Sequence, residues 1–145
     1  MILKKLWIGV LSLAFFAISC AEDTSKQQEE YHAVYKDVMD VHDKLMVRMT
    51  DIYEYSKELQ KIADTSAAPE KYIEAKERLT KTDNDMMNWM GNFGDTFVKN
   101  KSDIKEMDRQ KLEVQIIDLK KELTKVENMQ IGMTENLANA KELIQ

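Results

Sequence analysis

The chain has 145 residues and a formal net charge of −5, with only four glycines and one proline. The length suggests a single domain, and the shortage of turn-forming residues argues against a turn-rich β fold and favours long helices. An acidic chain also excludes a role that depends on neutralising nucleic-acid phosphates, because such binding needs a basic surface.

Residues 1–19 have the pattern of a signal peptide. Lys4 and Lys5 form a short basic region, and thirteen uncharged, mostly apolar residues follow from Leu6 to Ile18. Such a run has the length of a signal-peptide core and is too short to span a bilayer comfortably. We therefore expect residues 1–19 to be removed on export.

Cys20 is the expected lipidation site, and it is the only cysteine of the chain. The run Ala17-Ile18-Ser19-Cys20 resembles a bacterial lipobox, with alanine where leucine is usual. The resemblance implies two or three acyl chains on Cys20, and each buried CH₂ group contributes about 0.8 kcal/mol to membrane attachment. The alternative is ordinary cleavage before Cys20, which would leave a free thiol without a second cysteine to pair with.

Residues 20–29 are expected to be the lipidated end and a flexible acidic tether, because residues 21–29 include no large apolar side chain. Glu22-Asp23 resembles the acidic surface-export signals of Bacteroidetes lipoproteins, which favours the outer membrane, at its periplasmic or surface face. Without residues 1–19, which hold two lysines and no acidic residue, 19 basic residues remain against 26 acidic ones, a net charge of −7. An acidic surface of this kind is repelled by anionic headgroups.

Residues 30–145 are predicted to form three helices, over residues 30–64, 69–93 and 103–144. Apolar residues recur there in alternating steps of three and four, which is the heptad seam of packed helices. Pro69 suits the first turn of the second helix, and Asp103 with Glu106 has capping-box spacing for the third. The seam positions are Tyr31, Tyr35, Val38, His42, Leu45, Met49, Ile52, Ser56, Leu59 and Ala63, then Tyr72, Lys76, Leu79, Asp83, Met86, Met90, Phe93 and Phe97, then Leu112, Ile116, Leu119, Leu123, Val126, Gln130, Met133, Leu137, Ala140 and Ile144.

The predicted fold class is all-α, an up-down-up three-helix bundle with coiled-coil-like packing. Each helix has one apolar face that it cannot bury alone, and short connections make sequential helices antiparallel neighbours. Symmetric hairpins would leave the third helix projecting by about fourteen residues, roughly 20 Å. Leu137 and Ile144 would then need cover from a second copy or a partner protein, or the helix end would fray.

One group of residues suggests a ligand. The candidate metal site consists of His42, Met46, Met49 and Met90, with Trp89 as an indole cap. Met39 lies on the same helix face as His42, and antiparallel pairing brings His42 level with about residue 91. Imidazole and thioether ligands suit Cu(I) or Ag(I), and an indole attracts a cation. The alternative is that the methionines fill an irregular core and that His42 is a hydrogen-bonded core residue.

The sequence has no recognisable set of catalytic residues. It lacks a glycine-rich phosphate loop, a metalloprotease histidine pair and a serine elbow. Cys20 is used by the anchor, so no cysteine nucleophile remains. The protein is therefore predicted not to be an enzyme.

Part of the histidine and methionine region also carries a family resemblance. The run Val41-His42-Asp43 with Met46 and Met49, and the run Met86-Met87-Asn88-Trp89-Met90 with Phe93, resemble a group of small Bacteroidetes lipoproteins often labelled "viral A-type inclusion protein". The resemblance covers most of the exported chain and implies a helical architecture and an envelope location, without an activity. The expected function is a lipid-anchored, non-enzymatic helical interaction or structural module, with soft-metal (copper) binding as the alternative.

Overall fold

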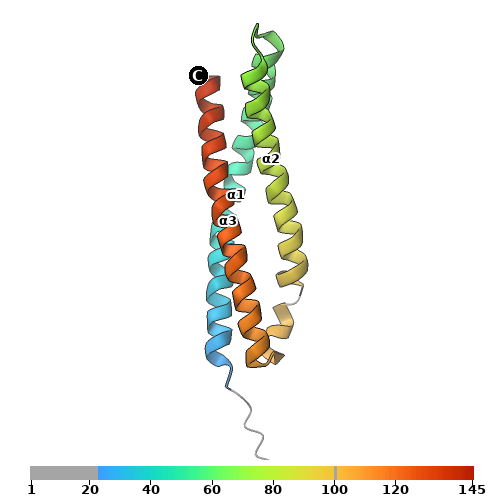
Figure 1. The fold of residues 1–145 in the computed structure, drawn as a ribbon, viewed down its shortest axis with the longest axis vertical. Coiled ribbons are helices and arrows are strands. Elements are labelled where there is room, and N and C mark those ends of the chain that lie inside the picture. Colours follow the sequence, from blue (N-terminus) through green and yellow to red (C-terminus); the bar gives the residue numbers. More distant parts are fainter. Residues whose placement is uncertain (1–22, 100) are drawn as a thin grey trace, which may run out of the picture.

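The protein is described by a computed structural model that covers residues 23–99 and 101–145 (Figure 1). The signal peptide, Cys20 and the start of the expected tether lie outside these residues. Helix α1 spans Ser25–Thr65, α2 spans Glu70–Phe93 and α3 spans Arg109–Ile144. A π-helical turn, η1 (Gly94–Val98), and a 3₁₀ segment, η2 (Lys101–Glu106), lie between α2 and α3.

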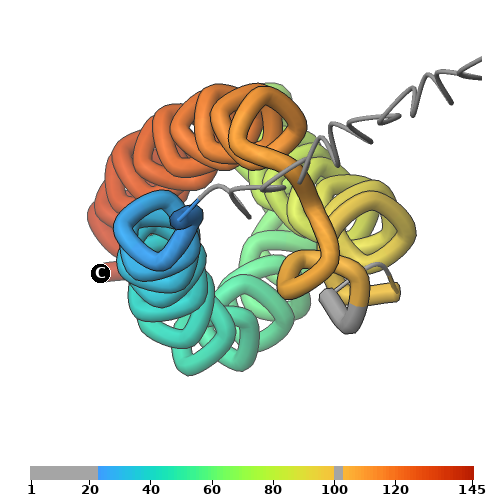
Figure 2. The backbone as a smooth tube through the Cα atoms, turned by 90° about the horizontal axis from the view of Figure 1, so that it is seen from below, coloured from blue at the N-terminus to red at the C-terminus, as the bar shows by residue number. Residues whose placement is uncertain are grey.

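The three long helices confirm the predicted all-α, up-down-up bundle. Seen along its long axis, the molecule has α1, α2 and α3 around a common centre (Figure 2). Helices α1 and α3 run in the same direction and α2 runs against both (Figure 1). Within the two described ranges, none of the helices has an apolar stretch long enough to cross a membrane.

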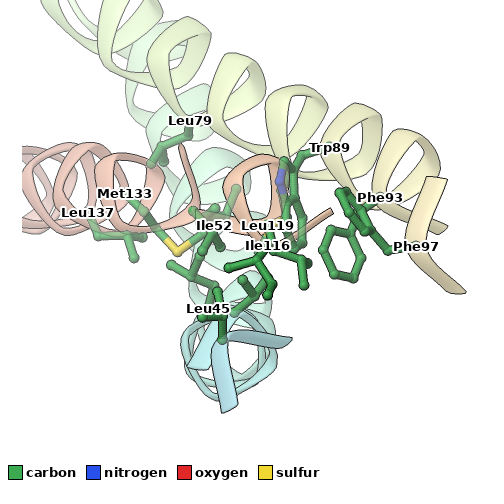
Figure 3. Packing of buried hydrophobic residues seen from close by; sticks show 14 of the residues in the cluster. Leu45, Ile52, Leu79, Trp89, Phe93, Phe97, Ile116, Leu119, Met133 and Leu137 are labelled. Carbon is green, nitrogen blue, oxygen red and sulfur yellow. The ribbon is translucent and has the colours of Figure 1, made fainter. Parts of the chain in front are cut away.

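The core is built from the predicted heptad seams, and every seam position is buried or half-buried. Leu45, Leu79 and Leu119 lose all or nearly all contact with solvent, and Figure 3 shows side chains from all three helices meeting between them. Burying each such side chain contributes about 1.5–3 kcal/mol. The polar seam residue Lys76 is accommodated by its hydrogen bond to Gln60 Oε1, at 2.5 Å.

Helix α1 begins earlier than expected, so residues 25–29 are helical and do not belong to a flexible tether. Lys26, Gln27 and Gln28 are polar but have straight side chains, which lose little freedom in a helix. The Asp23 carboxylate accepts a hydrogen bond from the Ser25 backbone N–H at 3.0 Å. The absence of apolar side chains therefore did not indicate the absence of a helix.

Helix α3 begins later than residue 103, because its N-cap is Asp108 and the capping-box pair Asp103 and Glu106 lies in η2. The Asp108 carboxylate accepts a hydrogen bond from the Lys111 backbone N–H at 2.8 Å, which satisfies one of the unpaired donors of the first turn. Ile104, in η2, is buried in the main core cluster. The segment before α3 thus packs against the bundle as a separate short element.

The expected projection of α3 is wrong. Helix α3 starts level with the start of α1, where Arg109 Nη2 donates to the Asp23 carbonyl at 3.2 Å. At its other end it stops below the α1–α2 turn (Figure 1), and Leu137 is buried. The physical reason is the long connection: η1 and η2 carry the chain further down before it turns, so the hairpins are not symmetric. The sequence argument for a partner or second copy on this helix end is therefore removed.

Candidate functional site

His42 and Met90 meet across the α1–α2 interface. The distance from His42 Nε2 to Met90 Sδ is 3.3 Å, and the His42 side chain is 15% exposed. The short turn after α1 fixes the antiparallel register, and this register brings His42 level with Met90, one residue from the predicted level of about residue 91. The structure thus joins two of the four proposed metal ligands.

Trp89 lies against the same histidine. Its ring centroid is 5.8 Å from that of His42, with 35° between the planes. The indole N–H donates to Glu122 Oε2 on α3 at 2.9 Å, which satisfies the polar atom of a side chain that is otherwise buried. Its place between α1 and α3 is therefore fixed by one ring contact and one hydrogen bond.

Met46 and Met49 do not join His42. A small hollow of about 170 Å³ beside His42 is lined by Met39, Trp89, Met90, Phe93, Gly94 and Val98. Met46 is 38% exposed, and Met49 packs against the core outside this hollow. Gly94 and Val98 of η1 line the hollow on the side of His42 toward the start of α1, whereas Met46 and Met49 lie one and two turns further along α1 in the opposite direction. Met39, one turn nearer the start of α1 than His42, takes the place that the sequence analysis gave to these two residues.

A stack of aromatic rings continues downward from the site. Trp89 and Phe93 have centroids 5.0 Å apart, Phe93 and Phe97 5.1 Å, and Phe93 and Tyr35 5.6 Å. Tyr31 extends the stack, 6.2 Å from Tyr35. Burial, with the neighbouring Tyr35 as a smaller cause, raises the pKa of Tyr31 to about 12. The lower half of the core is therefore largely aromatic.

A larger groove, which the sequence analysis did not find, lies between α2 and α3. Its main part has a volume of about 700 Å³ and is bordered by Trp89, Phe93 and Phe97. Its walls carry three asparagines and two ion pairs: Asn88, Asn92, Asn128, Lys121 with Asp118, and Lys125 with Glu122. The only sequence signal was the spacing of four that puts the three aromatic residues on one face.

The groove extends along the helices. A second hollow of about 280 Å³ shares Asp85, Asn128 and Met129 with the first and reaches Lys81 and Gly132. From Lys81 to Phe97 the combined groove follows the helix for about 24 Å at 1.5 Å per residue. At this length it is more extended along the helices than a compact pocket for a small metabolite.

No protein-family model, curated protein or solved structure matches this chain. Within the part of the chain that the structure describes, no three His, Cys, Asp or Glu side chains gather as metal ligands. Methionine thioethers are a different ligand type. The function is therefore argued from the His42 hollow and from the groove.

Proposed function

We propose that the protein is a lipoprotein of the cell envelope, anchored through Cys20, whose bundle binds a helical segment of a partner protein without enzymatic activity. The groove between α2 and α3 is the observation that carries this proposal. The anchor and the outer-membrane location rest on the sequence pattern around Cys20 and on Glu22-Asp23.

The shape of the groove favours a helix as its occupant. A groove between two helices, about 24 Å long, matches an amphipathic helix of four or five turns laid beside α2 and α3. Such a helix would complete a four-helix arrangement, in which each helix buries one apolar face. The rings of Trp89, Phe93 and Phe97 border the floor of the groove with only 3–7% of their surface exposed, and the half-buried Met129 adds apolar surface beside them.

The charged residues on the groove walls can also contact charged residues at the edges of such a partner helix. Lys121 pairs with Asp118 at 2.8 Å, and Lys125 pairs with Glu122 at 2.6 Å. Lys121 and Lys125 remain well exposed, so a partner with acidic residues at its edges can exchange contacts with them, as charged positions do beside coiled-coil seams. We therefore expect an amphipathic helix with an acidic margin.

Photo-crosslinking in whole cells tests this proposal. A photoreactive residue is placed at Asn92 or Asn128, which line the groove, and at Thr50 or Glu54, which are exposed on α1 outside it. We expect adducts to a partner from the groove positions alone. The crosslinked segment, prepared as a peptide, should bind the purified protein.

Two glycine substitutions supply the matched control. A Cβ at Gly132 or at Gly91 would meet nothing within 4 Å, but only Gly132 lines the groove. Gly132→Leu should therefore reduce crosslinking and peptide binding, whereas Gly91→Leu should not. Equal labelling from Thr50, no effect of Gly132→Leu, or adducts to another copy of this chain would each contradict the proposal.

A further inference from the structure

We propose that His42 and Met90, with Met39 beside them, bind Cu(I). This site lies between α1 and α2 and does not depend on a partner in the α2–α3 groove. It revises the ligand set suggested by the sequence, since Met46 and Met49 are replaced by Met39. Three features of the molecule support this site: the hydrogen bonding of His42, the distance between its Nε2 and Met90 Sδ, and the chemistry of the hollow.

The hydrogen bonding of His42 leaves Nε2 available as a ligand. Nδ1 lies 2.9 Å from Asp43 Oδ1. An ionised carboxylate can only accept a hydrogen bond, so in the neutral ring the proton belongs on Nδ1. Nε2 then presents a lone pair to the Met90 thioether, and neither atom offers a hydrogen to the other. A carboxylate that orients an imidazole in this way is a common feature of metal sites.

The distance between the two donor atoms fits a shared ion. Taking bond lengths of about 2.0 Å to nitrogen and 2.3 Å to sulfur, as at zinc, two ligands at a tetrahedral angle are separated by about 3.5 Å. The observed separation of Nε2 and Sδ is 3.3 Å. An ion can therefore bind both atoms with a side-chain shift of a few tenths of an ångström.

The surroundings select a soft ion of low charge. The hollow contains thioether and imidazole donors and aromatic carbon, and no carboxylate lines it. Such ligands favour Cu(I) over harder divalent ions, and a divalent charge without a carboxylate is costly to desolvate. Met39 is unbranched and can turn its sulfur toward the ion, while the Trp89 ring, 5.8 Å from His42, is within reach of a cation–π contact.

The test uses the lipid-anchored protein purified in detergent, and Trp7→Phe makes Trp89 its only tryptophan whether or not residues 1–19 have been removed. Ag(I), and Cu(I) held anaerobically by a competing chelator, are titrated while Trp89 fluorescence is recorded. We expect a saturable change at one ion per chain for both ions and none for Zn(II). The absence of a saturable response to Ag(I) and Cu(I) at micromolar concentrations would overturn the proposal.

Conservative variants locate the site. Met90→Leu and His42→Asn should each weaken binding about tenfold or more. Asp43→Asn should weaken it by about tenfold, since a hydrogen-bond partner that orients a metal ligand contributes that much. Met46→Leu and Met49→Leu are matched controls and should leave the affinity unchanged. Circular dichroism checks that each variant is folded. If Met90→Leu bound as tightly as the parent, or if Met46→Leu lost as much affinity, the assignment would be wrong.

Discussion

The two ends of this bundle use one sequence pattern to build two kinds of core. Near the α1–α2 turn, the seams supply aliphatic and small residues, such as Leu59, Ala63 and Ala140, and all three are buried. Toward the other end, the same seams supply Tyr35, Phe93 and Phe97. Small residues let the helices approach closely, whereas rings hold them further apart.

The aromatic side chains border two of the hollows, while a further hollow of about 390 Å³, lined by Gln60, Ile73 and Lys76, lies in the aliphatic half. Both the His42 hollow and the main part of the α2–α3 groove border Trp89 and Phe93, whereas Leu79, in the aliphatic half, borders none of the hollows described here. Heptad spacing therefore determines which residues face inward. The kind of residue at each level determines what lines a hollow, which is aromatic and thioether beside His42 and mostly polar beside Gln60.

Truncating one buried side chain in each half tests this comparison and has the largest expected effect. Leu79→Ala should cost about 4 kcal/mol of unfolding free energy, within the usual 2–5 range, because its closed surroundings relax little. Phe93→Ala removes more atoms but should cost only about 3 kcal/mol, at the low end for this change, because Phe93 already borders two hollows. Urea denaturation measures both.

The test depends on which of the two variants loses more unfolding free energy. If Phe93→Ala costs clearly more than Leu79→Ala, the aromatic half is packed as tightly as the aliphatic half. The slope of the unfolding free energy with urea should stay the same in both variants, since a changed slope would mean that the unfolded state or the cooperativity had changed.

The sequence predicted the parts of the fold that depend on local periodicity. All three seams, the antiparallel order and the pairing of His42 with residue 90 follow from apolar spacing and one short turn before Glu70. The connection from Gly94 to Asp108 lacks this periodicity. The capping-box spacing at Asp103 predicted the start of the third helix there, whereas α3 begins after Asp108. The length of the connection sets the level of α3, so the error there produced the mistaken projection of Leu137.

The sequence predicted those parts of the candidate site that depend on the α1–α2 register, and not the parts that depend on η1 or on α3. His42, Met90 and Trp89 are brought together by the α1–α2 register, which the short turn fixes. Which methionine on α1 lines the hollow depends on the side of His42 on which the hollow lies, and Gly94 and Val98 of η1 line that side. The α2–α3 groove depends on how far those helices stand apart, which no spacing within one helix encodes.

Alkaline unfolding provides a second test, since Tyr31 belongs to the aromatic half. Burial raises the pKa of Tyr31 to about 12, against 10.0 for an unperturbed phenol. As the pH rises, the phenol therefore loses its proton in the unfolded chain before it does so in the folded protein. The contribution of Tyr31 to the unfolding free energy is complete below pH 10 and is lost as the pH rises from 10 to 12. We expect the urea midpoint to fall less steeply over this range in Tyr31→Phe than in the parent. Tyr53→Phe, at an exposed position, should follow the parent curve.

The smallest expected effect comes from replacing one glycine in a regular helix and one in the π-helical turn beside the His42 hollow. Neither Gly132, in α3, nor Gly94, at the start of η1, has a positive φ, and a Cβ at either position would meet nothing within 4 Å. Alanine at each position should raise the unfolding free energy by about 0.8–1 kcal/mol, because glycine loses more backbone freedom on folding. Thermal denaturation measures the gain, and a loss in Gly94→Ala alone would mean that η1 requires glycine. An equal gain would mean that η1 does not require glycine and that Gly94 only leaves space beside Met90.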